Sequence, residues 1–105
     1  MTELRRGFSL SELQAYVHIC EAERGFAGES SLEKCLLLGE EVGELFKAVR
    51  KASGMKIDPD SSVSQVSEEL ADILNYLLAI ANRFGIDLDA AFADKERTNR
   101  FRSWS

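Results

Sequence analysis

The sequence has little that would break a helix, cross a membrane or bind a soft metal. It contains one proline and no apolar run near the roughly 20 residues that a membrane-spanning helix needs. No apolar segment follows the first six residues, so no signal peptide is expected. The single histidine, His18, stands apart from the acidic clusters, and Cys20 and Cys35 lack metal-ligand spacing. We expect a cytoplasmic protein with no membrane partner, whose cysteines are reduced core thiols.

Length and charge narrow the choice of partners. A chain of 105 residues has the length of one domain, which we expect residues 1–105 to form. A chain of this size buries a modest core, so association with further copies would help it. Its formal net charge of −5 disfavours binding to a nucleic-acid polymer through the phosphate backbone. The same charge is compatible with a nucleotide that is held through a metal ion.

Apolar residues recur at helical spacing in several segments, and no segment alternates as a strand would. Serine or aspartate stands before each of these segments, as helix caps do. The sequence therefore predicts an all-α fold of four helices. The expected helices run from Ser9 to about 24, from Ser30 or Ser31 to about 53, from Ser62 or Ser64 to about 84, and from Asp87 or Asp89 to about 102.

The third expected helix is apolar over most of its circumference. Leu70, Leu74 and Leu77 belong to this apolar surface. A helix that is apolar nearly all round is typically buried, so we expect this one to lie in the core or in a seam between subunits. On the fourth helix, Ala91 and Phe92 are expected to face inward.

Carboxylates cluster on the second and third expected helices. Glu40, Glu41 and Glu44 fall within roughly 100° of arc, at about 100° per residue. The segment Glu68–Asp72 repeats this arrangement with three acids on one side of the next helix. Two such ridges facing each other would form a pocket of oxygen ligands for a hard divalent cation.

The ordinary explanation of such a cluster is a solvated helix face, because charged side chains are rarely buried. Leu37 and Ala48 lie on the same helix face as the glutamates, however, so we do not expect that face to be fully exposed to solvent. Like charges four residues apart, such as Glu40 and Glu44, also destabilise a helix unless cations offset them. If a metal binds, oxygen ligands without histidine or cysteine favour Mg²⁺, or Mn²⁺ as a substitute, together with substrate phosphates.

These motifs resemble those of the MazG-type all-α nucleoside triphosphate pyrophosphohydrolases. The resemblance rests on Glu-Glu-x-x-Glu at 40–44 and Glu-x-x-Asp at 69–72, and it extends to Gly-Ile-Asp-Leu at 85–88 and the basic last helix. It covers about residues 30–102 and implies a four-helix MazG-like bundle, assembled as a dimer or a dimer of dimers. It also implies Mg²⁺-dependent cleavage of a nucleoside triphosphate, with a deoxynucleotide as the expected substrate, to monophosphate and pyrophosphate in nucleotide-pool cleaning.

The resemblance assigns roles to particular side chains. Those that match the family's metal ligands are Glu41, Glu44, Glu69 and Asp72. Glu40 is the candidate for the base that orients or deprotonates the attacking water, with Glu41 as the alternative. The candidate substrate-binding residues are Asn75, Lys95, Asn99 and Arg102. Three aromatic residues could stack on a base, although aromatics at helical spacing are usually core: Phe26, Tyr76 and Trp104.

Two other functions fit the same residues. The first is a non-enzymatic helical interaction module, in which the third helix is a dimer seam and the acids form a solvated rim. The second is a hydrolase of the same fold that acts on dUTP or on another phosphorylated metabolite. Replacing Glu41 or Asp72 by its amide should abolish turnover in the enzyme but have little effect on an interaction module. The other hydrolase is distinguished by the substrate that it prefers in a panel.

Overall fold

The structure is a computed structural model, which describes residues 3–57, 59 and 63–102. Within this part of the chain it has four α-helices and no strand, which confirms the all-α prediction. The helices are α1 (Leu10–Arg24), α2 (Ser31–Ala52), α3 (Val66–Arg83) and α4 (Leu88–Arg100). Over the same residues, none of the helices combines the length and the apolar character that crossing a membrane requires.

Local sequence accounts for most of the helix starts. Ser9 forms a capping box with Glu12 at the start of α1, and Ser30 does the same with Glu33 at the start of α2. The Asp87 side chain accepts a hydrogen bond from the backbone of the first turn of α4. The predicted caps at these three starts are therefore confirmed.

The start of α3 differs from the prediction. Gln65 occupies the N-cap position and makes no side-chain capping hydrogen bond. Ser64 is not the cap, because its hydroxyl donates to the carboxylate of Glu69 instead. The other candidate, Ser62, lies outside the described residues.

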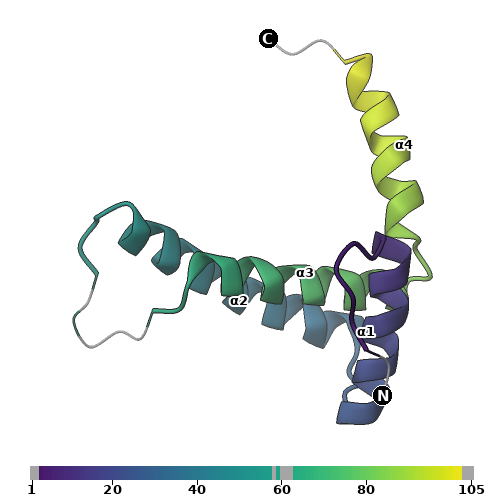
Figure 1. The fold of residues 1–105 in the computed structure, drawn as a ribbon, viewed down its shortest axis with the longest axis horizontal. Helices are drawn as coiled ribbons and strands as arrows, with labels where there is room; N and C mark the ends of the chain where they lie inside the picture. Colours follow the sequence, from purple (N-terminus) through teal and green to yellow (C-terminus); the bar gives the residue numbers. More distant parts are fainter. Residues whose placement is uncertain (1–2, 58, 60–62, 103–105) are drawn as a thin grey trace.

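The helices form an open arrangement (Figure 1). The longest two, α2 and α3, lie side by side, and α1 lies across one end of this pair. The buried core is formed where α1 meets α3, from Val17, Leu78 and Ala79, with Leu13 and Leu88 packed around them. The last helix, α4, touches α1 near its own start and then runs away from α2 and α3.

Polar contacts with α1 fix the direction in which α4 leaves. Buried Gln14 donates to the backbone oxygen of Ile86 at 2.7 Å and accepts from the backbone nitrogen of Leu88 at 2.9 Å. The hydroxyl of Ser11 lies 2.8 Å from Asp87 Oδ1 and 2.7 Å from Asp89 Oδ2. The turn between α3 and α4 is thereby attached to the first turns of α1.

Several residues expected in the core are exposed in a single chain. Leu70 is 54% exposed and Leu77 43% exposed on α3, and Phe92 is 65% exposed on α4. Cys20 is buried as predicted, whereas Cys35 is exposed. The radius of gyration is 16.4 Å, against about 13 Å for a compact domain of this length. The expectations for α4 and Cys35 are wrong for one chain, and α3 is only partly buried, because none of the described helices covers these faces.

An ionic network ties α1, α2 and α3 together. The two terminal nitrogens of Arg83 are each 2.8 Å from a carboxylate oxygen of Glu21. The ammonium of Lys34 lies 3.1 Å from Glu21 and 2.7 Å from Glu29. Hydrogen bonding from Arg83 lowers the pKa of Glu21 against the opposing effect of burial. The stabilisation from Glu21 is therefore present near neutral pH and is lost as the pH falls through this lowered pKa.

The network should matter more for stability than any exposed ion pair. Replacing Arg83 by Met leaves the Glu21 carboxylate without its two-point partner, and should lower the free energy of unfolding by about 3 kcal/mol. The matched control is Arg97→Met, which removes the exposed pair with Asp94 and should cost less than about 0.5 kcal/mol. Urea unfolding followed by circular dichroism measures both, and equal losses would contradict the role given to the network.

Candidate metal and nucleotide site

The packing of α2 against α3 brings three carboxylates together. One oxygen each from Glu41, Glu69 and Asp72 lies within 4.8 Å of the other two. Glu41 comes from the middle of α2, and the other two come from the first two turns of α3. The two acidic ridges that the sequence places on consecutive helices thus meet at these residues.

Like charge dominates the electrostatics of this group. Hydrogen bonding to Glu69, burial, and the charges of Glu69 and Asp72 together raise the pKa of Glu41 to about 7. Glu69 is only 5% exposed, and one of its oxygens accepts from Ser64. Its other oxygen, Oε2, is buried, and while Glu41 is ionised it has no hydrogen-bond donor among the described residues.

These observations fit a divalent cation. A buried carboxylate oxygen without a donor is costly in the absence of positive charge. Oxygen ligands are those that Mg²⁺ and Mn²⁺ prefer, and one cation would offset the repulsion within the group. The residues that would hold it are Glu41, Glu69 and Asp72.

The two remaining acids of the α2 motif lie beside this group. Glu44 is half-buried and lies 3.7 Å from Lys47, one turn further along the helix. Glu40 is exposed next to Glu41. Neither contributes to the cluster of three, and their roles as ligand and base stay predictions.

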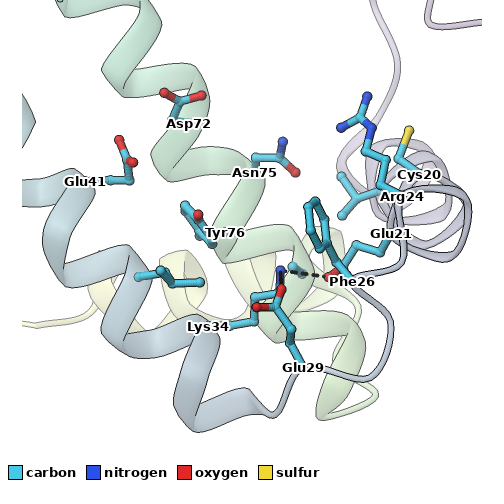
Figure 2. A pocket seen from close by; sticks show the side chains of 13 residues that line it. Cys20, Glu21, Arg24, Phe26, Glu29, Lys34, Glu41, Asp72, Asn75 and Tyr76 are labelled. Atoms are coloured by element: carbon cyan, nitrogen blue, oxygen red, sulfur yellow. Dashed lines mark ion pairs between the residues drawn. The ribbon is translucent and has the colours of Figure 1, made fainter.

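A cavity of about 310 Å³ begins at the carboxylates and extends between α1, α2 and α3 (Figure 2). Glu41 and Asp72 line one side of it, and Asn75 and Tyr76 follow from α3. Phe26, from the loop after α1, lies on the other side. Two aromatic side chains and the amide that the sequence singled out therefore share the cavity with two of the acids. Trp104 lies outside the described residues.

The predicted substrate contacts on α4 are not brought to this cavity within one chain. Lys95 and Arg102 are exposed, and Asn99 donates to Glu96 on the same helix at 3.2 Å. All three lie on or just after α4, which runs away from the α2–α3 pair (Figure 1). A contribution to the site from these residues requires the α4 of another subunit.

Sequence reasoning missed the charged residues at the far side of the cavity. Glu21, Glu29 and Lys34 line this part, and Lys34 is only 5% exposed. Burial opposes its charge, but hydrogen bonds from Lys34 to Glu29 and Glu21 outweigh that and raise the pKa of Lys34. The sequence does contain an indication of this, since Lys34 precedes Glu41 by seven residues and therefore lies on the same face of the helix.

The fold and site are those of an all-α protein with a carboxylate cluster at the edge of a cavity, and comparison identifies the family. The family model of the MazG nucleotide pyrophosphohydrolase domain matches residues 28–100, more than half of the chain. The chain belongs to the MazG nucleotide pyrophosphohydrolase family. A comparison with curated protein sequences finds no significant match.

Solved structures agree with this assignment. The crystal structure of YPJD from Bacillus subtilis is 26% identical with a TM-score of 0.78, over 94% of this chain and all 100% of that one. Two crystal structures of iMazG from Vibrio DAT 722 are also similar. One is 30% identical with a TM-score of 0.66 over 93% of this chain and 100% of that one. The other is 36% identical with a TM-score of 0.67 over 89% and 99%.

The crowding of carboxylates predicts that the metal-free protein is strained at this site. At pH 8 in chelator, Glu41 is ionised beside two other carboxylates, so Glu41→Gln should raise the melting temperature by a few degrees. At pH 5 the gain should shrink, because below a pKa of about 7 the Glu41 side chain of the folded wild type is already protonated.

Differential scanning fluorimetry at the two pH values measures this difference. The control is Glu68→Gln, which removes an exposed charge beside Glu69 and should change the melting temperature little. A Glu41→Gln protein that is less stable than wild type at pH 8 would argue against repulsion as the dominant force in the cluster.

Proposed function

We propose that the chain is a Mg²⁺-dependent nucleoside triphosphate pyrophosphohydrolase that converts a nucleoside triphosphate, with a deoxynucleotide as the expected substrate, to monophosphate and pyrophosphate. The observation that supports this most is the cavity with two chemically different ends. Carboxylates that fit a metal lie at one end, while Phe26 and Tyr76 lie further in. A nucleotide has the same division, with phosphates that bind through a cation and a flat base.

The reaction needs a water molecule placed in line with the bond that breaks. Water attacks the α-phosphorus, the bond from that phosphorus to the bridging oxygen of the β-phosphate breaks, and pyrophosphate leaves. Glu40 is exposed beside Glu41 and is the proposed acceptor of the proton that the water loses. Glu41, Glu69 and Asp72 are the proposed ligands, with Glu44 added when the site is occupied. Bound Mg²⁺ would neutralise charge on the phosphate oxygens.

An enzyme of this kind would act on the cytoplasmic nucleotide pool and remove unwanted triphosphates. The net charge of −5 agrees with a small nucleotide rather than a nucleic-acid polymer as substrate. iMazG from Vibrio DAT 722, at 30% and 36% identity, supports the assignment to this class. We propose that residues 1–105 form one MazG-like domain.

Changing each acid to its amide should distinguish the metal ligands from the base by the effects on turnover and on Mn²⁺ binding. Asp72→Asn and Glu41→Gln should abolish turnover and weaken Mn²⁺ binding, because each removes a charged ligand. Glu40→Gln should lower kcat by about 10²–10⁴-fold and leave Mn²⁺ binding nearly unchanged, as expected for loss of a general base. Glu68→Gln is the matched control and should keep both properties.

Steady-state kinetics and titration of Mn²⁺ followed by electron paramagnetic resonance give the two readouts. Full activity in Asp72→Asn would contradict the enzyme proposal. It would favour the alternative in which the acids are a solvated rim of an interaction module.

The substrate class is tested with a panel of ribo- and deoxynucleoside triphosphates in Mg²⁺, in Mn²⁺ and in chelator. The proposal expects metal-dependent release of pyrophosphate rather than single phosphate. Hydrolysis of dUTP alone among the triphosphates, or of another phosphorylated metabolite in preference to all of them, would instead favour the alternative hydrolase of the same fold. A folded protein that turns over no member of the panel would contradict both.

We also propose a homodimer or homotetramer, supported by the exposed apolar side chains and the large radius of gyration. Leu36 and Phe46 on α2 are 66% and 63% exposed, and Phe92 on α4 is 65% exposed. Single chains rarely leave so many large apolar groups in contact with water. A second copy would cover these faces and could bring Lys95, Asn99 and Arg102 of its α4 to the phosphates.

Mixing two inactive variants tests whether the site is shared. Asp72→Asn lacks a metal ligand, and a Lys95→Ala, Arg102→Ala protein lacks basic groups on and after α4. If each site combines α3 of one subunit with α4 of another, refolding the two together should restore part of the wild-type activity. No recovery, or a monomer in sedimentation at micromolar concentration, would contradict a shared site.

A further inference from the structure

The end of the cavity away from the carboxylates presents a hydrogen-bond donor beside an acceptor. The ammonium of Lys34 has three N–H donors, and two are accounted for by Glu21 at 3.1 Å and Glu29 at 2.7 Å. Within the described part of the chain Lys34 has no third ion-pair partner, so one donor remains for an acceptor in the cavity that it lines. The Glu29 side chain is 30% exposed and lines the same cavity, so its carboxylate can accept hydrogen bonds from a ligand.

Arg83 fixes the loop that carries Glu29 by hydrogen bonds to the loop backbone. Its Nε donates to the backbone oxygen of Glu29 at 2.7 Å, and its Nη2 donates to the backbone oxygen of Phe26 at 3.1 Å. The same guanidinium makes the two-point contact with Glu21, which in turn holds Lys34. Donor and acceptor are thus fixed relative to one another before any ligand arrives, which lowers the ordering cost of binding.

Two aromatic rings stand next to this pair. The Lys34 ammonium is 5.3 Å from the centre of the Phe26 ring and 5.6 Å from the centre of the Tyr76 ring. Figure 2 shows Phe26 and Tyr76 on different sides of the space above Lys34. A flat heterocycle with a polar edge suits these surroundings, since its faces can contact rings while its edge meets the charged pair.

We propose that Lys34 and Glu29 read the edge of the nucleobase and select bases that present a ring carbonyl next to a ring N–H. This inference rests on the proposed function, in which the phosphates lie at the carboxylate end of the cavity. Lys34 donates to the carbonyl oxygen and Glu29 accepts from the adjacent N–H, both with the strength of charge-assisted hydrogen bonds. Guanine, uracil and thymine have this edge, and the amino group of guanine offers Glu29 a second N–H.

Adenine and cytosine have the opposite edge. Each presents an amino group, which would face the Lys34 ammonium, and an unprotonated ring nitrogen, which would face the Glu29 carboxylate. Donor then meets donor and lone pair meets lone pair, so the base gives no hydrogen bond to the third N–H of Lys34 or to the remaining lone pairs of Glu29. Adenine and cytosine nucleotides should therefore be poor substrates.

Two measurements on the full chain test the selection. The first is kcat/KM for guanine, uracil and thymine nucleoside triphosphates against those of adenine and cytosine, in Mg²⁺. The second is direct titration with GMP and AMP, which needs no turnover. Wild type should favour the first group by at least about tenfold in kcat/KM and GMP over AMP in binding.

Glu29→Gln should reduce this preference towards equality, because an amide offers both a donor and an acceptor to the base. The matched control is Glu23→Gln, which changes an exposed glutamate near the end of α1 and should keep the wild-type preference. Lys34→Arg keeps the positive charge but moves the donors, and it should also reduce the preference. Melting curves test whether each variant is folded. If Glu29→Gln or Lys34→Arg is unfolded, the remaining one of the two is compared with wild type.

The outcomes separate this inference from the proposed function. Equal hydrolysis of all bases by wild type, or an unchanged preference in folded Glu29→Gln, overturns the base selection while the hydrolase stands. No hydrolysis of any triphosphate together with tighter binding of GMP than AMP supports the base selection and overturns the hydrolase. Tighter binding of AMP than GMP shows that the ionic cluster is structural only and overturns the base selection.

Discussion

Repulsion between carboxylates across the α2–α3 pair is the constraint around which this structure is arranged. At Glu41, Glu69 and Asp72 the two helices hold one oxygen from each of three acids within 4.8 Å of one another. A folded chain that tolerates a Glu41 pKa of about 7 and a buried, unpartnered oxygen on Glu69 has given up stability at this position. Such a loss is common at functional sites, and a cation bound here would offset it.

The Arg83 network supports this arrangement from the other end of the cavity. Arg83, Glu21 and Lys34 connect the last turn of α3 to α1 and to the first turn of α2. They fix the distance between the helices that supply the acids, and they order the loop that carries Phe26 and Glu29. A chain of 105 residues with a small apolar core thus uses ionic contacts to set the shape of its cavity. The same contacts give the cavity a second charged end, around Lys34, that differs from the carboxylate end.

The positions of most helix starts follow from local sequence, whereas the exposure of side chains and the packing of the helices do not. Capping boxes at Ser9 and Ser30 place the starts of α1 and α2, because they depend on residues three apart. The exposure of Phe92 could not be predicted, because the direction of α4 is set by contacts of Gln14 with a turn more than 70 residues away. The acids could be found from helical spacing alone. The approach of Glu69 to Glu41, and the ion pairs of Lys34, depend on how helices pack and so needed the structure.

The most direct test of the central claim is a crystal structure grown with Mn²⁺, with anomalous diffraction measured at the manganese edge. The account predicts an anomalous peak among the carboxylates of Glu41, Glu69 and Asp72, at about 2.0–2.3 Å from at least two of them. It also predicts that the peak disappears in Asp72→Asn crystals grown in the same way. A fully formed protein crystal with no peak at these residues, or with manganese bound only elsewhere, would contradict the claim that the acidic cluster is a metal site.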